Sequence, residues 1–135
     1  VRTINETDYI NDSKATNINS VIVAINTFDQ PIVLILGGYN KGANFRLLLP
    51  HIKSSHVRNI VSYGDAGGQI NTALGDAVRS VQVTDLSSAV KKAQLMAAPG
   101  DIVLLSPGCA SFDEFSNFEE RGNHFKSIIK NLAAS

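Results

Sequence analysis

Short β-branched and aliphatic runs alternate with segments of helical periodicity along most of this sequence, and this alternation is what most constrains its fold. A run of four or five such residues is the length of a β-strand. Strand, helix and strand, repeated over short loops, predict an α/β fold with a mostly parallel sheet and helices on both faces. The expected strands are Asp8–Asn11, Ile32–Leu36, Asn59–Ser62, Ser80–Val83 and Ile102–Leu105.

The segments between these strands carry their apolar residues at the 3.6 period of an α-helix. Thr84 or Asp85 is placed to cap the first turn of one helix with a side-chain oxygen. The unbroken apolar run Ile32–Leu36 is typical of a central strand that is buried on both faces. The expected helices lie over residues 18–28, 47–52, 70–74, 86–97 and 118–132.

Size and charge limit the classes of function. The 135 residues correspond to about one domain, so we expect a single domain over 1–135. Twelve Lys plus Arg balance twelve Asp plus Glu, which argues against nucleic acid as a partner. No apolar run approaches the roughly 20 residues that a bilayer requires, so we expect no membrane segment and a cytoplasmic location. The lone Cys109 excludes an internal disulfide, and with three scattered His residues it makes a metal site unexpected.

Loops at the carboxyl ends of the predicted strands are the candidate functional segments. In open parallel sheets, ligands bind beyond these ends, where the chain leaves a strand for a helix. The loops to consider are Asp12–Asn17, Gly37–Asn44, Gly64–Gly68 and Ser106–Asn117.

The loop after Ile32–Leu36 contains two glycines and Lys41. Glycine permits positive φ and close backbone approach, and Lys41 could direct a cation at a carboxylate or a phosphate. The spacing fits neither a P-loop nor a G-x-G-x-x-G turn. The alternative is that this glycine-rich turn is only a tight connection.

The loop after the first predicted strand offers an acceptor, a cation and a hydroxyl in Asp12, Lys14 and Thr16. Such a set could bind a polar ligand at the strand end. The simpler interpretation, which we favour from the pattern alone, is that Ser13, Thr16 or Asn17 caps the following helix.

The loop that follows the fifth predicted strand combines small residues with a proline and a glycine. Ser111 could donate to a carboxylate, and successive backbone amides could form an anion-binding nest. Cys109 could be a nucleophile, but a small buried thiol is the better interpretation because no histidine is close in sequence. Phe118 is expected in the core, although it lies close to this loop in sequence.

Taken together, these loops resemble those of the Mur ligases of peptidoglycan synthesis, in particular the C-terminal domain of UDP-N-acetylmuramoyl-L-alanine:D-glutamate ligases. The order and spacing match over essentially the whole chain. Tyr39 stands where many relatives carry an acid, and Phe112 stands where leucine is common. The motifs that carry the resemblance are Asn11–Asn17, Leu36-Gly37-Gly38 with Lys41, Leu104–Asp113, and Phe115, Asn117–Glu119 and Arg121–Asn123.

The resemblance implies a single Rossmann-like α/β domain that works with two further domains. One holds the uridine nucleotide, and a central ligase domain in cis supplies the P-loop and most contacts to ATP and Mg²⁺. The implied reaction joins D-glutamate to UDP-N-acetylmuramoyl-L-alanine through an acyl phosphate. No catalytic residue and no metal ligand is expected within 1–135, and the isolated domain is expected to be inactive.

The resemblance also assigns residues to ligands. The expected D-glutamate-binding residues are Thr16, Lys41, Ser111, Phe112 and Phe118, with Phe112 acting through its backbone. Asp12 and Lys14 are expected to reach ATP, Asp12 through a ribose hydroxyl. The alternative function is a free-standing binding domain for an acidic amino acid or a nucleotide, without catalysis.

Overall fold

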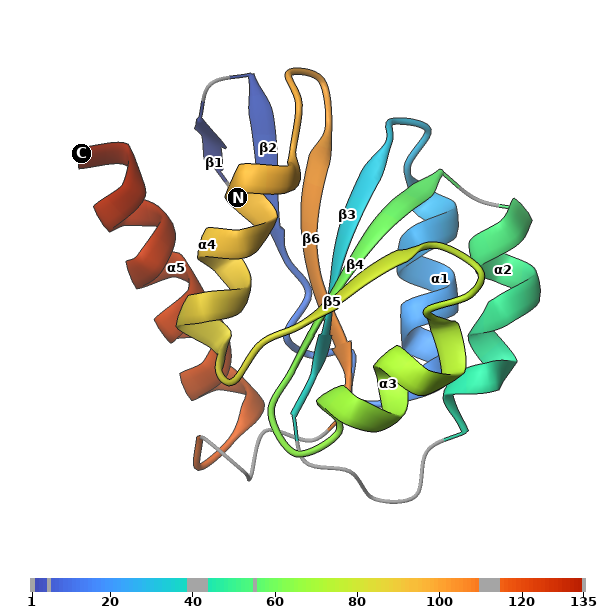
Figure 1. Ribbon diagram of the computed structural model, residues 1–135. Helices are drawn as coiled ribbons and strands as arrows, with labels where there is room; N and C mark the ends of the chain where they lie inside the picture. Colours follow the sequence, from blue (N-terminus) through green and yellow to red (C-terminus); the bar gives the residue numbers. More distant parts are fainter. Residues whose placement is uncertain (1, 5, 39–43, 55, 110–114, 135) are drawn as a thin grey trace.

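A six-stranded sheet forms the centre of the computed structural model, which describes residues 2–4, 6–38, 44–54, 56–109 and 115–134 (Figure 1). The strand order is β1-β2-β6-β3-β4-β5. Only the β1–β2 pairing is antiparallel, and the other four are parallel. The strands are β1 (Arg2–Ile4), β2 (Thr7–Asn11), β3 (Ile32–Gly37), β4 (Val57–Tyr63), β5 (Arg79–Gln82) and β6 (Ile102–Gly108).

Helices cover both faces of this sheet, as the alternation predicts. One face carries α1, α2 and α3, and the opposite face carries α4 and α5 (Figure 1). A short 3₁₀ turn precedes α2, so the helix expected over 47–52 is composite. The helices are α1 (Ile18–Thr27), η1 (Phe45–Leu48), α2 (Leu49–Ser54), α3 (Gly67–Leu74), α4 (Leu86–Met96) and α5 (Phe118–Ala134).

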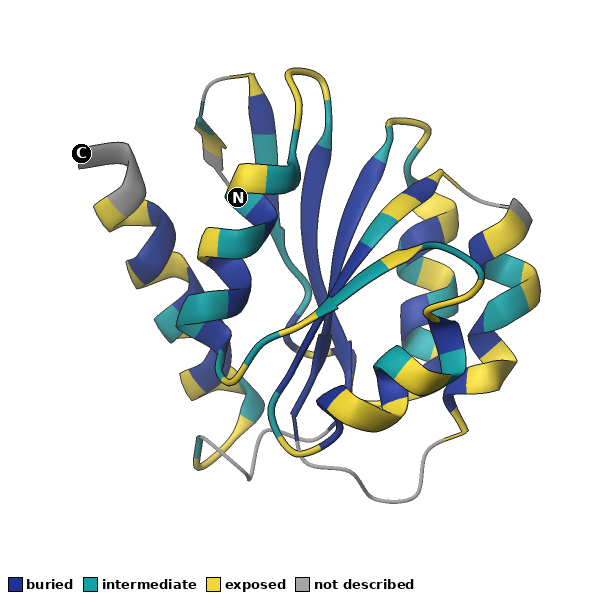
Figure 2. Cartoon of the chain, in the orientation of Figure 1, coloured by how far each residue is buried: buried dark blue, intermediate teal, exposed yellow. Residues whose placement is uncertain are grey.

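The central strands explain why their sequences are continuously apolar. Ile32 and Leu34 of β3 pack into the cluster beneath α1–α3, whereas Val33 and Ile35 pack into the cluster beneath α4 and α5. Every residue of β3 and β6 is buried, as Figure 2 shows in dark blue. Side chains of a strand alternate between faces, so a strand covered on both sides needs apolar residues at every position.

Two helices begin at capping residues that are among those the sequence indicates. The Asn17 side chain accepts from Ser20 N at 2.9 Å at the start of α1, and Asp85 accepts from Ser88 N at 2.8 Å at the start of α4. The hydrogen bonds from Ser88 lower the pKa of Asp85, with Lys91 and His124 adding favourable charge. The cap of α4 is therefore Asp85 and not Thr84.

All five expected strands are present, with ends within three residues of those predicted. The strand missing from the prediction is β1, which has three residues and pairs antiparallel with β2 at the sheet edge. Among the described residues, no helix is both long and apolar enough to cross a membrane.

Candidate functional site

The carboxyl ends of β2, β6 and β3 are neighbours in the sheet, so the loops that leave them meet at one edge. Asn11 pairs with Leu105, Leu105 with Ile35, and Gly37 with Gly108. Residues separated by almost a hundred positions in the chain thus lie side by side. This is the edge at which the sequence predicts a ligand site.

The loop between β2 and α1 is tied closely to β6. Asp12 N donates to Leu105 O at 2.7 Å, which continues the β2–β6 pairing by one residue. Gly108 N donates to Ala15 O at 2.8 Å. Lys14 and Thr16 are exposed on this loop, so both side chains are accessible to a ligand.

Asp12 is an acid of this edge that is held in a fixed position. Its Oδ2 accepts a hydrogen bond of 3.0 Å from the hydroxyl of Ser106, which is fully buried in β6. Burial raises the pKa of Asp12, while the hydrogen bond from Ser106 and the charge of Lys14 act in the opposite direction. Asp12 is therefore an oriented acceptor held at the end of the sheet.

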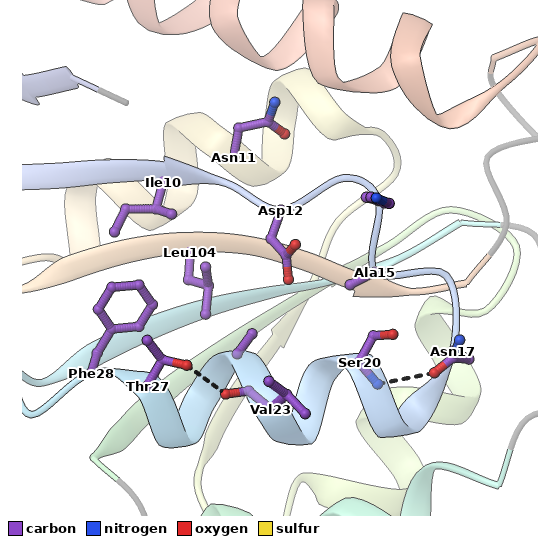
Figure 3. Close-up of a pocket in the computed structure, with 12 residues that line it drawn as sticks. Ile10, Asn11, Asp12, Ala15, Asn17, Ser20, Val23, Thr27, Phe28 and Leu104 are labelled. Atoms are coloured by element: carbon purple, nitrogen blue, oxygen red, sulfur yellow. Dashed lines mark hydrogen bonds between the residues drawn. The ribbon is translucent and has the colours of Figure 1, made fainter.

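Two cavities flank the loop that carries Asp12 and Lys14. The larger, of about 650 Å³, lies between β2 and α1, with polar groups at one end and apolar ones such as Phe28 at the other. Figure 3 shows the Asp12 carboxylate turned toward α1, on the side of this cavity. The smaller, of about 320 Å³, lies between the loop and the first turns of α5, and Phe118 lines it.

The structure thus brings together part of the predicted site. Asp12, Lys14 and Phe118 line one cavity. Thr16 lies on the same loop and is exposed, and Asn17 rather than Thr16 caps α1. The remaining predicted residues, Lys41, Ser111 and Phe112, lie outside the described residues.

Several other side chains near this edge or in α5 have structural roles. Cys109 is buried, with 3% of its surface exposed, as expected for a small apolar thiol. Phe125 is in the core, whereas Phe118 is only partly buried. Glu119 and Glu120 lie in the first turn of α5, where negative charge is favourable. Within the described ranges, no three His, Cys, Asp or Glu residues gather as a metal site.

Sequence reasoning missed a buried polar cluster behind the loop. Arg121 of α5 is fully buried, and its Nε and Nη2 donate to Ser13 Oγ at 3.0 Å and Ser13 O at 2.9 Å. The Ser13 hydroxyl in turn donates to Phe118 O at 2.7 Å. Gly122, the next residue in α5, is a local signal, because glycine permits a close approach of the backbone to its neighbours.

A family model described as "Mur ligase, glutamate ligase domain" matches residues 1–109. The chain belongs to this Mur ligase family. It is 46% identical over 126 residues to a UDP-N-acetylmuramoylalanine–D-glutamate ligase of Chlamydia caviae, covering 93% of this chain and 30% of that protein. It is also 42% identical over 133 residues to the protein of that name from Salinibacter ruber, covering 98% of this chain and 29% of that protein.

A solved structure supports the fold of this Mur ligase domain. The structure is a domain of a protein assigned as a UDP-N-acetylmuramate:L-alanyl-γ-D-glutamyl-meso-diaminopimelate ligase from Haemophilus ducreyi. The TM-score is 0.51 at 16% identity, over 98% of this chain and 94% of that one. The resemblance and the fold class predicted from the sequence are both confirmed. The chain spans about 30% of the length of its curated relatives.

Proposed function

We propose that this chain is the amino-acid-binding C-terminal domain of an ATP-dependent ligase that adds D-glutamate to UDP-N-acetylmuramoyl-L-alanine in peptidoglycan synthesis. Identity of 42–46% to ligases of that name, extending over 93–98% of the chain, carries the proposal. The geometry supports it, because Asp12, Lys14 and Phe118 line one cavity beside the exposed Thr16.

In the proposed reaction, the γ-phosphoryl group of ATP passes to the substrate carboxylate and gives an acyl phosphate. The amine of D-glutamate attacks the acyl carbon, and inorganic phosphate leaves from the tetrahedral intermediate. Catalysis of this kind depends on positioning and on stabilising charge. This domain contributes positioning. The remainder of the enzyme supplies the P-loop and binds Mg²⁺ and the uridine nucleotide. ATP and the nucleotide substrate place the reaction in the cytoplasm.

A dicarboxylate presents two separated anionic ends. Lys41 pairs with a carboxylate of D-glutamate, and Ser111 hydrogen-bonds a carboxylate, with the backbone of the adjacent Phe112 contributing. Thr16 and Phe118 bind the other end of the amino acid. In this arrangement a cation and neutral hydrogen-bond donors bind the two carboxylates of D-glutamate.

Asp12 and Lys14 reach ATP in the proposed complex. Asp12 lies at the polar end of the larger cavity, where its carboxylate, held by Ser106, can accept from a ribose hydroxyl. Lys14 is exposed beside it and can approach a phosphate. The same loop therefore carries groups for the nucleotide and, through Thr16, for the amino acid.

Replacing Lys41 by alanine in the full-length enzyme tests the amino-acid site. We expect the KM for D-glutamate to rise roughly tenfold or more, because a hydrogen bond to a charged group contributes about 1.5–3 kcal/mol. The KM for ATP should change much less. Lys53→Ala, at an exposed position of α2, is the matched control and should leave both KM values unchanged. An unchanged KM for D-glutamate in Lys41→Ala would remove that residue from the site.

The intact mass of the natural polypeptide tests the alternative of a free-standing binding domain. A chain several times the 14.5 kDa of these residues supports the ligase, because only a longer chain can include a P-loop domain. A natural product of 14.5 kDa would favour a binding domain without catalysis.

A further inference from the structure

We propose that Ser13 is a positioning residue of the ligase reaction, an inference that rests on the function proposed above. Its hydroxyl joins the loop that carries Asp12 and Lys14 to the start of α5, where Phe118 lies. Ser13 borders the smaller cavity, but in this proposal its hydroxyl acts through Phe118 and Arg121 and not by contact with a substrate. It sets the distance between the groups that bind ATP and a group that binds D-glutamate.

Burial is the first observation that carries the proposal. Ser13 is 3% exposed and Arg121 is 0% exposed. A fully buried arginine is rare unless it is paired, and in the described part of the chain both acceptors of this guanidinium belong to Ser13. Arg121 Nη1 is buried and has no hydrogen-bond partner among the residues that the structure describes. Any shift of Ser13 would leave still more of the guanidinium unpaired, so its position is strongly restrained.

The second observation is how the hydroxyl of Ser13 is used. It donates to Phe118 O at 2.7 Å and accepts from Arg121 Nε at 3.0 Å, so both directions of the hydroxyl go to α5. The start of α5 is itself ordered, because Asn117 Oδ1 accepts from Glu120 N at 2.8 Å. The loop is thus joined to an ordered helix start.

The third observation is that little space separates α5 from the loop. A Cβ atom built on Gly122 would lie 3.0 Å from Asn11 Nδ2 and 3.3 Å from Ser13 Cβ. The backbone of α5 therefore lies directly against the loop, and a larger residue at 122 would force the two apart. On its other side the loop is held by β6, through Asp12 N and Leu105 O.

These contacts predict a particular kinetic result. Without the Ser13 hydroxyl, the loop keeps its hydrogen bonds to β6 but is no longer fixed in position relative to Phe118. Groups for both substrates lie on the two sides of this junction, so binding of both should weaken. A purely structural role predicts something else, because a smaller folded fraction lowers the apparent kcat and leaves each KM as it was.

The test compares Ser13→Ala with Ser62→Ala in the full-length enzyme. Ser62 is also a fully buried serine, and its hydroxyl donates to Val81 O at 3.4 Å between β4 and β5, away from the loop. We expect Ser13→Ala to raise the KM values for D-glutamate and for ATP about tenfold each, since it removes a bond from a charged donor. Ser62→Ala should change neither KM.

The wild-type enzyme is assayed first for ADP formation that depends on D-glutamate, and a negative result there would overturn the proposed function itself. With an active wild type, a Ser13→Ala enzyme in which neither KM or only one KM rises would overturn the role of Ser13. If Ser13→Ala does not fold, Ser13→Cys replaces it, because a thiol keeps the side-chain shape and is a weak donor. With Ser13→Cys, a rise in both KM values supports the role of Ser13, and a rise in only one or in neither overturns it.

Discussion

The contact at Gly37 allows a prediction whose size can be worked out from the structure. Gly37 ends β3 with φ +154°, where the chain leaves the sheet toward Lys41. A Cβ atom at this position would lie 2.3 Å from the carbonyl oxygen of Tyr63 in β4 and 2.6 Å from Cδ1 of its ring. Non-bonded heavy atoms prefer roughly 3.5 Å, so alanine would overlap a backbone atom by about 1 Å.

Two terms contribute to the expected loss in the free energy of unfolding of Gly37→Ala. Backbone strain at a sparsely populated φ costs about 1–3 kcal/mol, and overpacking a tight contact costs about 1–3 kcal/mol. We therefore expect a loss of about 4 kcal/mol, a large fraction of the roughly 5–15 kcal/mol that stabilises a domain. Gly100 is the matched control, because its φ is +92° and no atom of the described residues lies within 4 Å of a Cβ built there. Gly100→Ala should lose about 1–2 kcal/mol in the free energy of unfolding, because only the backbone strain applies there.

Urea unfolding of the 135-residue chain, followed by far-ultraviolet circular dichroism, measures both variants. The Gly37→Ala midpoint should fall well below that of Gly100→Ala, with an unchanged slope in both. Equal midpoints, or a higher one for Gly37→Ala, would refute the argument that the approach of Tyr63 requires glycine.

Three further predictions concern acids and the core. At neutral pH, Asp12→Asn should unfold at the same urea concentration as the wild type or at a higher one, and a clearly lower midpoint would contradict this. Burial raises the pKa of Asp12, so the stability that its protonated carboxyl contributes is lost as pH rises through the raised pKa. The KM of this variant for ATP should nevertheless rise. Asp85→Ala should lose about 1 kcal/mol at pH 7 through the missing cap. The Asp85 pKa is lowered from 3.8, so the difference from wild type should shrink as pH falls below 3.8, which unfolding at two pH values checks. Phe125→Ala should lose about 3–5 kcal/mol of unfolding free energy, because Phe125 of α5 is 1% exposed and belongs to the core cluster between the sheet, α4 and α5. A loss below about 1 kcal/mol would contradict this, because it would mean that the surrounding side chains fill the cavity.

The fold was largely predictable because burial on two faces leaves a direct trace in the sequence. Ile32–Leu36 is apolar at every position, and the helices between strands show one apolar stripe each. The start of the apolar stripe limited the predicted cap of α4 to Thr84 or Asp85, and the structure shows that it is Asp85. The strand Arg2–Ile4 was not predictable from the sequence, because three residues are too few to show a period. It is defined by its antiparallel pairing with β2.

The candidate site was predictable only in part. Strand ends indicate the loops, so Asp12, Lys14 and Thr16 follow from the pattern and their roles from the resemblance. The link between Ser13 and Arg121 spans 108 positions, and an arginine in an amphipathic helix normally lies on its solvent face. The roles of Lys41, Ser111 and Phe112 stay predictions.

The strand order has a consequence for how the molecule is made. β6 lies between β2 and β3, so among the described strands β2 pairs with β1 and β6 and not with β3. During synthesis, β3 and β4 can pair early, but β2 cannot join them in the sheet until residues 102–108, which form β6, have emerged. One edge of β3 therefore stays unpaired while residues 38–101 are being made, and the ligand-binding edge of the sheet is assembled after them. Protection of unfinished chains from edge-to-edge association should matter more here than in a sheet whose strands add in sequence order.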